Sequence, residues 1–468
     1  MRLIFLPVVA VCCFLSVIGW ANTILVTSTS DSGTGSLRAA LATATNGDTI
    51  DASSVTGTIL LSSGELFITN GVDIIGPGPA NLAVDGNFPQ TTNRVFHFAS
   101  NVVATISSLM ITNGRPGTGS VGGGIFNDRS TLTVSNCSVV GNIGGGIRNK
   151  SGSGSATLVV ANCTISGNST SKAFGDGAGI GNDGSGGNAT LLVLNTTING
   201  NTQASGEGGG ISCSGGFPGT SVVSIVNSTV SGNFASYGGG GLINSPGSGQ
   251  AILVLSNCTF SGNSTDGIFI PLASGGGVSI LNIGNTILNN TPFPNIIKYS
   301  GTITSMGYNL TSDNAGGGLT ATGDQINTDP KLGPLQNNGG PTFTHALLPG
   351  SPAIDAGDPG FSSPAEFDQR GSGFPRVVNG RIDIGAFEFT PDLLITAVDR
   401  VGNDLRLTFG VALSGENYEV QSRTNLNFGS WESLGDSILG NGSTAQVTVT
   451  NAFVVPQQFF RIYRLPNL

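Results

Sequence analysis

A phrase of nine residues recurs through the middle of this chain and constrains its fold more than any other feature. The first clear copy reads Val-Ser-Asn-Cys-Ser-Val-Val-Gly-Asn at residues 134–142. Further copies lie at residues 160–168, 193–201, 225–233 and 255–263, so that successive copies are 26 to 33 residues apart. A repeat of this length is one rung of a solenoid and is too short to be a domain.

The apolar residues of each copy alternate in a way that predicts β-strands. Counting back from the first Asn of the phrase, the fourth and second residues are apolar: Leu132 and Val134, Leu158 and Val160, Leu191 and Val193, Val223 and Ile225, Leu253 and Leu255, and Leu281 and Ile283. After the Asn the inward phase shifts by one residue, giving Cys137 and Val139, Cys163 and Ile165, Thr196 and Ile198, Ser228 and Val230, and Cys258 and Phe260. A third apolar position follows a Gly-rich run, at Ile125, Ile147, Ile180, Ile211, Leu242 and Ile268. Period-two alternation in three segments per rung predicts an all-β parallel β-helix with three strands per turn.

Asparagines at the bends are expected to stack along the axis of this β-helix. One column is Asn136, Asn162, Asn195, Asn227, Asn257 and Asn285, a second is Asn142, Asn168, Asn201, Asn233 and Asn263, and a third is Asn127, Asn149, Asn182 and Asn244. Neighbouring rungs lie about 4.8 Å apart, so each side-chain amide can donate to a carbonyl of the next rung. The 74 glycines would indicate disorder in an aperiodic chain, but here they fall at turns where a positive φ is useful.

Four cysteines follow the N-terminal apolar segment. Cys137 and Cys163 occupy one inward column on neighbouring rungs, where a disulfide is conceivable in an oxidising compartment. The same column also holds Thr196 and Ser228, which indicates that the position needs a small side chain. Stacked free thiols are therefore the preferred interpretation, and Cys213 is expected to be an unpaired substitute in the third Asn column.

The N-terminal hundred residues precede the regular repeats. Residues 1–21 read as a secretory signal peptide, because a basic start precedes a long apolar stretch and small residues follow it. Cleavage is expected after Ala21, and an uncleaved membrane anchor is the alternative. Residues 22–100 read as an N-terminal cap with the first irregular rungs, in which a short amphipathic helix at residues 36–42 would cover the open end of the core. Regular rungs occupy residues 101–300.

Residues 301–388 break the repeat and carry a succession of unusual short motifs. These are Gly-Tyr-Asn-Leu at 307–310, Asp-Pro-Lys-Leu-Gly-Pro-Leu at 329–335, Asn-Asn-Gly-Gly-Pro-Thr at 337–342, Thr-His-Ala-Leu at 344–347, Gly-Ser-Pro-Ala-Ile-Asp-Ala-Gly at 350–357, Asp-Gln-Arg-Gly at 368–371 and Asp-Ile-Gly-Ala-Phe-Glu at 383–388. Together they resemble the choice-of-anchor Q region that closes secreted, right-handed parallel β-helix proteins of the bacterial cell surface. The resemblance implies a C-terminal cap over residues 301–390 and a location at the outer cell surface or outside the bacterium. It brings no catalytic residues.

The same region is acidic, with nine acidic and four basic side chains between residues 301 and 390. Its aspartates could supply oxygen ligands to a structural calcium ion: Asp313, Asp324, Asp329, Asp355, Asp358, Asp368 and Asp383. No spacing matches a known calcium loop, and Asp beside Gly or Pro commonly ends turns by bonding to nearby backbone. We therefore expect no cofactor, with structural calcium as the alternative, and expect Asp368 and Arg370 to pair within the cap.

The last segment, residues 391–468, contains short alternating runs separated by turns. About six strands in so short a segment predict a small β-sandwich. Carbohydrate binding through Trp431 or Tyr418 is one interpretation of its aromatic residues, and packing in the core of the module is the preferred one.

Parallel β-helices include polysaccharide lyases and hydrolases. A lyase needs a base beside carboxylates, and a hydrolase needs two carboxylates that flank the scissile bond. The best cluster between residues 101 and 300 is Asp128, Arg129, Arg148, Lys150 and Asp183. Asp128, Lys150 and Asp183 occupy equivalent positions on successive rungs, which places the carboxylates about 9.6 Å apart, near the upper limit for an inverting pair. A surface ladder of acid–base–acid salt bridges is the simpler interpretation. His97 and His345 are expected to be structural.

Two functions remain open from the sequence. One is a non-catalytic secreted or cell-surface protein, an adhesive or glycan-contacting scaffold whose loops form the contact face. The alternative is a polysaccharide lyase or glycoside hydrolase of the pectin-lyase-like type, with the loops at 170–180 and 202–209 forming a groove over the charged cluster. The net charge of −9 argues against nucleic acid as a partner. We expect a monomer that contacts polysaccharide or a cell-surface glycan and has no transmembrane segment after removal of the signal peptide.

Overall fold

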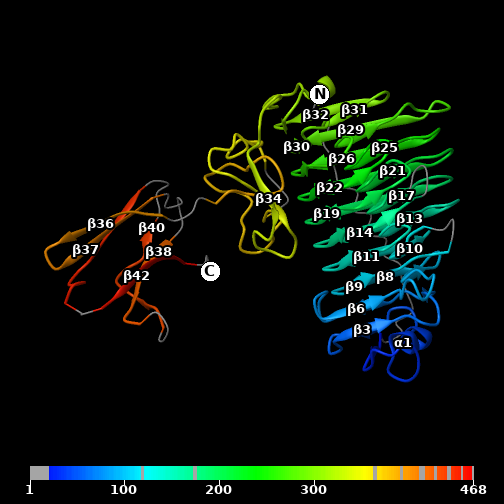
Figure 1. Ribbon diagram of the computed structural model, residues 1–468, viewed down its shortest axis with the longest axis horizontal. Coiled ribbons are helices and arrows are strands. Elements are labelled where there is room, and N and C mark those ends of the chain that lie inside the picture. Colours follow the sequence, from blue (N-terminus) through cyan, green and yellow to red (C-terminus); the bar gives the residue numbers. More distant parts are fainter. Residues whose placement is uncertain are drawn as a thin grey trace.

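The computed structural model describes residues 21–117, 121–171, 177–361, 366–390, 394–410, 417–425, 430–439, 444–454 and 457–465. Residues 1–20, which hold the expected signal peptide, lie outside these ranges. Most of the described chain winds into a parallel β-helix, seen side-on in Figure 1 as a stack of strands from α1 at one end to β31 and β32 at the other. The predicted fold class is confirmed.

Three parallel sheets form the walls of the β-helix, and each rung contributes one strand to each sheet. Sheet A contains β1 (Thr23–Leu25), β2 (Thr49–Asp51), β5 (Asp73–Ile75), β8 (Val103–Ser107), β11 (Thr131–Ser135), β14 (Ser155–Ala161), β18 (Asn188–Leu194), β22 (Thr220–Val226), β26 (Gln250–Ser256), β29 (Val278–Gly284) and β32 (Thr302–Gly307). Sheet B contains β3 (Gly57–Leu60), β6 (Leu82–Asp85), β9 (Met110–Thr112), β12 (Ser138–Val140), β15 (Thr164–Ser166), β19 (Thr197–Asn199), β23 (Thr229–Ser231), β27 (Thr259–Ser261), β30 (Ile287–Asn289) and β33 (Leu310–Thr311). Sheet C contains β4 (Leu66–Ile68), β7 (Phe96–Phe98), β10 (Ile125–Asp128), β13 (Ile147–Lys150), β17 (Ile180–Asp183), β21 (Ile211–Ser214), β25 (Leu242–Ser245), β28 (Ile268–Ile270) and β31 (Ile296–Lys298). A short fourth sheet joins β16 (Ser169–Thr170), β20 (Thr202–Gln203) and β24 (Phe234–Ala235) at the corner between sheets B and C.

The predicted inward residues form one continuous hydrophobic core. Leu158, Leu191 and Val223 are register partners on β14, β18 and β22 and are fully buried. The same core extends from Val26 near the first rung to Leu319 beyond the last one. Residues of sheets A, B and C therefore alternate between this core and the outer side of each sheet. Many outward residues of sheets B and C are themselves covered, such as Thr197, Thr229 and Ser212.

The bend between sheets A and B explains the first Asn column. Asn136, Asn162 and Asn195 have φ values of 51°, 54° and 47°, a left-handed conformation that Asn tolerates better than most residues. Their side chains also stack: Asn195 Nδ2 donates to Asn162 Oδ1 at 3.2 Å and Asn227 Nδ2 donates to Asn195 Oδ1 at 3.3 Å. The bonds thus run between side chains, whereas the sequence suggested bonds to carbonyls.

The second Asn column is a buried ladder inside the β-helix. From Asn168 onward each side-chain oxygen accepts two bonds from the preceding asparagine, as where Asn201 Oδ1 accepts from the backbone N–H and from Nδ2 of Asn168, at 3.0 and 2.9 Å. The ladder runs through Asn142, Asn168, Asn201, Asn233, Asn263, Asn290 and Asn295. It ends at Asp313, whose carboxylate accepts both the backbone N–H and Nδ2 of Asn295. A carboxylate suits this end because it only accepts hydrogen bonds.

The inward column that contains Cys163, Thr196 and Ser228 forms a second series of hydrogen bonds between rungs. The backbone N–H of Cys163 donates to Thr196 Oγ1, and that of Thr196 donates to Ser228 Oγ. All four described cysteines are free and buried, and burial raises the pKa of Cys137 and Cys258 to about 12. Unreactive thiols that fill a hydrogen-bonding column fit the preferred interpretation better than a disulfide does.

Both ends of the core are covered. At the N-terminal end, helix α1 (Leu37–Thr43) buries Leu37 and Ala40 against the first rungs, and the Ser36 side chain caps it by accepting from the Ala39 N–H. At the other end, the short 3-10 helix η1 (Ala315–Gly317) places Ala315 over the core. Covered ends protect the strand edges from pairing with other chains.

Residues 329–389, here called the lateral segment, do not continue the end cap but fold back along sheet B, as the yellow ribbon around β34 in Figure 1 shows. Gln369 donates to Thr197 Oγ1 at 2.9 Å and accepts from Thr229 Oγ1 at 2.6 Å, thereby spanning two rungs. The Ala386 N–H donates to Thr259 Oγ1 on the next rung, at 3.1 Å. The expected C-terminal cap is thus divided between the end of the solenoid and its side.

The lateral segment has a small core and a polar interior of its own. A hairpin pairs β34 (Leu332–Gln336) with β35 (Thr344–Leu347), and Leu347 packs with Phe387 and with Ile287 of sheet B. His345 is buried between the segment and sheet B, where Nε2 lies 2.9 Å from Ser231 Oγ and Nδ1 lies 2.8 Å from the Gly333 carbonyl oxygen. Burial lowers the pKa of His345, which fits a structural role.

The C-terminal module consists of two antiparallel sheets. One contains β36 (Leu394–Val401), β37 (Asp404–Gly410) and β41 (Ala445–Val449), and the other contains β38 (Asn417–Arg423), β39 (Glu432–Ser433), β40 (Ile438–Leu439) and β42 (Phe459–Arg464). Leu405 and Leu407 of the first sheet pack against Val420 of the second, so the predicted sandwich-like arrangement is confirmed. Among the described residues, no helix has the length and apolar character needed to span a membrane.

Candidate functional site

The charged cluster predicted from the sequence lies on the outer face of sheet C. Asp128, Lys150 and Asp183 are register partners at the ends of β10, β13 and β17, as expected from their equivalent positions. Arg148 lies two residues before Lys150 and is outward as well, and its guanidinium packs against the backbone of Gly181 on the next rung. The parallel register therefore brings the predicted residues together.

The ion pairs in this cluster differ from the expected ladder. Asp128 pairs with Arg129 beside it, at 3.1 Å, and Asp183 pairs with Arg148, at 2.7 Å. Lys150 forms no ion pair with any described residue. The expected Asp128–Lys150–Asp183 alternation is corrected, because the longer and forked arginine side chains reach the diagonal and adjacent carboxylates.

The state of these carboxylates does not suit proton donation. Burial raises the pKa of Asp183, but the Arg148 charge and bonds from Ser185 outweigh it and lower the pKa overall. For Asp128, burial is likewise outweighed by Arg129, and the pKa is lowered. A general acid needs a pKa raised toward neutrality, so neither carboxylate of the predicted pair is prepared for that role.

An aromatic strip crosses the outer face of the first three strands of sheet C. Phe67, His97 and Phe126 are register partners on β4, β7 and β10. The His97 ring makes edge-to-face contacts with Phe67 and with Phe126, at centroid distances of 4.8 and 5.0 Å. Phe67 is 53% exposed although it is large and apolar. Sequence reasoning treated His97 as structural and missed the strip, whose signal is an apolar residue at the outward phase of Leu66-Phe67-Ile68.

Charged side chains hold the aromatic strip in place. Glu65 accepts from Arg94 at 3.2 Å and lies 2.8 Å from His97 Nδ1. The Arg94 guanidinium also stacks on Phe126, 4.7 Å from the ring centroid. Burial raises the pKa of Glu65, and His97 and Arg94 more than compensate, so that the pKa is lowered. The strip thus combines rigid apolar faces with fixed polar groups.

A second aromatic contact lies on the same face near the other end of sheet C. Phe269 of β28 and Tyr299 beyond β31 meet edge to face at 5.8 Å, and Tyr299 is 64% exposed. Five strand spacings separate β10 from β28, about 24 Å along the axis. The exposed rings of this face are therefore Phe67 and Tyr299, whereas Phe269, Arg148 and Asp183 between them are buried.

Two further carboxyl groups, missed by sequence reasoning, lie at the corner that leads into sheet C. The backbone of Glu207 forms a parallel β-bridge with that of Gly238. The carboxylate of Asp266 accepts from the Gly239 N–H at 2.6 Å. Burial raises the pKa of Asp266 to about 7, with a further contribution from the charge of Glu207. Burial also raises the pKa of Glu207. Glu207 and Asp266 lie on rungs separated by two strand spacings, which is about 9.6 Å along the axis of the β-helix.

The opposite pKa shifts of Asp266 and Asp183 give a test of this description. The folded state binds the Asp266 proton more tightly than the unfolded state, so stability falls as pH rises from about 4 to about 7. We expect Asp266→Asn to raise the free energy of unfolding at pH 8 by about 2 kcal/mol, roughly half of the full linkage value because the loop can relax. Asp183→Asn should instead lower it, since the buried ion pair with Arg148 is lost. Denaturant unfolding at pH 5 and pH 8 measures both, and a gain for Asp183→Asn or a loss for Asp266→Asn would contradict the assignment.

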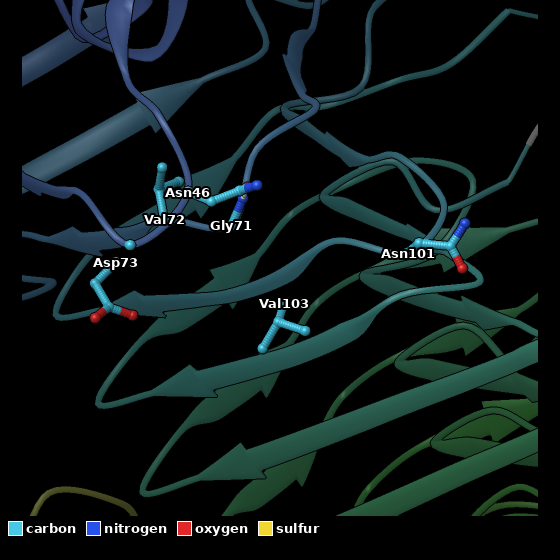
Figure 2. Close-up of a pocket in the computed structure, with 7 residues that line it drawn as sticks. Asn46, Gly71, Val72, Asp73, Asn101 and Val103 are labelled. Atoms are coloured by element: carbon cyan, nitrogen blue, oxygen red, sulfur yellow. Dashed lines mark hydrogen bonds between the residues drawn. The ribbon is translucent and has the colours of Figure 1, made fainter. Parts of the chain in front are cut away.

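A shallow hollow near the N-terminal end of sheet A offers little chemistry. It has a volume of about 460 Å³ and is lined by Asn46, Gly47, Gly71, Val72, Asp73, Asn101 and Val103. Figure 2 shows these residues spread over loops and over β5 and β8 of sheet A, with Asp73 as the one ionisable group among them. A Cβ on Gly71 would lie 2.6 Å from the Val103 carbonyl oxygen, so glycine is required for close packing there. We assign no function to this hollow.

The aspartates considered as calcium ligands have other partners. Asp313 and Asp324 end hydrogen-bond series of the β-helix, since Asp324 Oδ1 accepts both the backbone N–H and Nδ2 of Asn309. Asp329 and Asp358 accept from backbone N–H groups two residues ahead, at Lys331 and Gly360. Within the described part of the chain, no group of three His, Cys, Asp or Glu residues could hold a metal ion.

The groove expected over the charged cluster can be followed only in part. Residues 172–176 of the first loop lie outside the described residues. Residues 202–209 begin with β20 of the short fourth sheet and carry Glu207 at the margin of sheet C. This loop therefore adds a carboxyl group beside the outer face.

The fold and this face define a parallel β-helix protein with an aromatic and charged outer wall. No protein-family model and no curated protein matches the sequence. Similar solved structures include a variant GH87 alpha-1,3-glucanase catalytic domain in complex with tetrasaccharides, with 14% identity over 54% of this chain and 63% of that chain and a TM-score of 0.23. Another GH87 alpha-1,3-glucanase catalytic domain, in complex with nigerose, has 15% identity over 61% of this chain and 69% of that chain and a TM-score of 0.23. Likeness at this level carries no argument about activity.

Proposed function

We propose that this protein is a non-catalytic, extracellular or cell-surface β-helix scaffold that contacts a glycan along the outer face of sheet C. The observation that carries the proposal is the aromatic strip of Phe67, His97 and Phe126, held in place by Glu65 and Arg94. Aromatic rings present flat apolar faces on which sugar rings can pack, and the fixed polar groups beside them can bond to hydroxyls.

The geometry of sheet C suits an extended ligand. Its outward residues repeat once per rung, a spacing of about 4.8 Å, which is comparable to the length of one sugar ring in a polysaccharide. The aromatic strip spans the three rungs of β4, β7 and β10, so a chain could lie along the axis over that distance. Beyond the strip, Arg148, Asp183 and Phe269 are buried and would contribute little to the contact. Repeated weak contacts can then add up without a deep pocket.

Sequence features support the proposed location. The N-terminal leader at residues 1–21 and the choice-of-anchor Q-like motifs in residues 301–388 both favour export and display at the envelope. The described part of the lateral segment contacts sheet B, at Thr197, Thr229 and Thr259. A monomer displayed in this way would present the aromatic strip, with its half-exposed Phe67, to its surroundings.

Binding can be tested by electrophoresis of residues 22–468 through gels that contain plant, algal or microbial polysaccharides. We expect at least one neutral polysaccharide to retard the protein. The double variant Phe67→Ala/Phe126→Ala should weaken that binding about thirtyfold, because each ring contributes about 1 kcal/mol. Phe217→Ala, which removes a ring that is 77% exposed and lies outside sheet C, is the matched control. Equal losses for the control and the double variant would overturn the proposed contact face.

Glycoside hydrolysis is the second candidate function, and the observation that favours it is the pair Glu207 and Asp266. The rungs that carry them lie about 9.6 Å apart along the axis, a spacing in the range of an inverting pair, and Asp266 is the group with a pKa of about 7. Release of reducing ends that is lost in Asp266→Asn would establish hydrolysis at this pair. If release is lost in Lys150→Ala instead, the reaction takes place at the cluster of Asp128, Lys150 and Asp183. If the unaltered protein releases no reducing ends, the non-catalytic scaffold remains the proposed function.

A further inference from the structure

A separate aromatic and cationic surface lies on the C-terminal module. Trp431 stands between two guanidinium groups, with Cζ of Arg423 4.6 Å and Cζ of Arg461 4.5 Å from its ring. Arg461 also lies 5.0 Å from the ring of Tyr463. Arg423 belongs to β38, Arg461 and Tyr463 belong to β42, and Trp431 directly precedes β39. The four side chains therefore gather on one sheet of the module.

This arrangement corrects the expectation that Trp431 packs in the module core. The cores consist of residues such as Leu405, Val420 and Phe409, and Tyr418 is the aromatic residue that packs there, at 2% exposure. Trp431 is only partly buried and Tyr463 is 38% exposed. The indole stacks on arginines at the surface instead, so its face is part of an accessible platform.

The hydrogen bonds of Arg461 leave its charge without an acidic partner among the described residues. Arg461 Nε donates to the neutral side chain of Gln421 at 2.7 Å, and Arg461 forms no ion pair with any described residue. Glu419, the register partner of Tyr463, accepts from Gln421 and from Ser433 Oγ. An anion placed over the indole beside Arg461 would give this guanidinium the charged partner that no described residue supplies.

We propose that the platform of Arg423, Trp431, Arg461 and Tyr463 binds an acidic polysaccharide. Carboxylate or sulfate groups on the polymer would accept charge-assisted bonds from the guanidinium forks. The exposed Tyr463 ring would pack against a sugar ring next to the charged group. The site is separate from sheet C, and its ligand differs from a neutral glycan in needing an anionic substituent. The net charge of −9 disfavours general attraction of polyanions, which points to recognition at this surface and not to bulk charge.

The test uses residues 22–468 in gels that contain polygalacturonate, dextran sulfate or neutral dextran. We expect retardation by at least one of the acidic polymers, none by dextran, and weaker retardation as salt is raised. Arg461→Gln should weaken binding about tenfold, and Arg461→Lys should lie between it and the unaltered protein, because Lys keeps the charge but loses the fork. Retardation by polygalacturonate alone identifies carboxylate as the anion recognised, and retardation by dextran sulfate alone identifies sulfate.

Arg400→Gln is the matched control, since Arg400 stacks on Phe453 at 4.4 Å on the other sheet of the module and its loss changes the charge equally. Equal weakening by Arg400→Gln and Arg461→Gln would overturn the proposal, as would no retardation by either acidic polymer. Retardation by single-stranded DNA to the same extent would overturn it too, by showing a general polyanion effect. Near-ultraviolet circular dichroism of each variant checks that the module remains folded. The Phe67→Ala/Phe126→Ala variant should bind the acidic polymer normally, so failure here is distinguishable from failure of the sheet C site.

Discussion

Replacing Asn201 by alanine is expected to lower the free energy of unfolding by about 4 kcal/mol. The side chain is fully buried, accepts from the backbone N–H and Nδ2 of Asn168, and donates to the Ile165 carbonyl and to Asn233 Oδ1. Its removal leaves two buried hydrogen-bond donors of Asn168 without this acceptor, and each unsatisfied donor costs about 1 to 3 kcal/mol. The lost packing volume adds to this cost.

Denaturant unfolding followed by far-ultraviolet circular dichroism measures the Asn201→Ala effect. Asn188→Ala is the matched control, because Asn188 begins the strand β18 of the same rung but is exposed. We expect the control to change stability by less than about 0.5 kcal/mol. A similar small change for Asn201→Ala would show that the ladder is not a source of stability. Because solenoids can unfold stepwise, the first transition is the one to compare.

Replacing Arg370 by methionine should release the lateral segment from the solenoid. Arg370 and Asp368 form a buried ion pair at 2.6 Å, and the guanidinium is held between the rings of Phe374 and Phe387, at 4.0 and 3.8 Å. The variant leaves the fully buried Asp368 carboxylate without its counter-charge, which costs about 3 to 5 kcal/mol. That cost is comparable to the whole stability of a small structural unit.

Hydrogen exchange separates release of the lateral segment from global unfolding. In Arg370→Met, peptides within residues 366–389 should exchange much faster, while peptides of β18 and β22 keep their protection. Arg129→Met is the control, because it removes an arginine from the exposed pair with Asp128, and we expect no detectable change from it. Unchanged exchange in residues 366–389 of Arg370→Met would contradict the structural role assigned to the pair.

The fold of the solenoid could be predicted from the sequence because its information is local and repeated. Leu132, Val134 and Val139 already show the inward phase and its shift at the bend, and every later copy repeats the same pattern. Stacking then follows from the repeat, since equivalent residues must become register partners. The same logic brought Asp128, Lys150 and Asp183 together correctly.

What the sequence could not supply was contact between segments that do not repeat. Asp183 pairs with Arg148, which lies diagonally from it, and not with its register partner Lys150. The length of the side chains decides this pairing, and the register does not show it. Gln369 bonds to Thr197 and Thr229, which precede it in the sequence by 172 and 140 residues. No local pattern indicates that the lateral segment covers these threonines. Asp266 gains its raised pKa from burial at a corner, which is a property of the assembled rungs.

The aromatic strip was missed for a different reason. Phe67 and Phe126 lie at outward positions, where apolar side chains are uncommon on a free face, and His97 was assessed alone. Comparing outward positions across rungs would have shown three consecutive rings in one column. Reading both faces of a repeat with equal care thus recovers surface sites as well as cores.

The most direct test of the account is hydrogen–deuterium exchange of residues 22–468 with and without a polysaccharide that retards the protein in gels. We expect protection in the peptides that contain β4, β7 and β10, where Phe67, His97 and Phe126 lie, and in their flanking corners. Protection should disappear in Phe67→Ala/Phe126→Ala. Protection confined to sheet A, sheet B or the C-terminal module would contradict the central claim that the outer face of sheet C contacts the glycan.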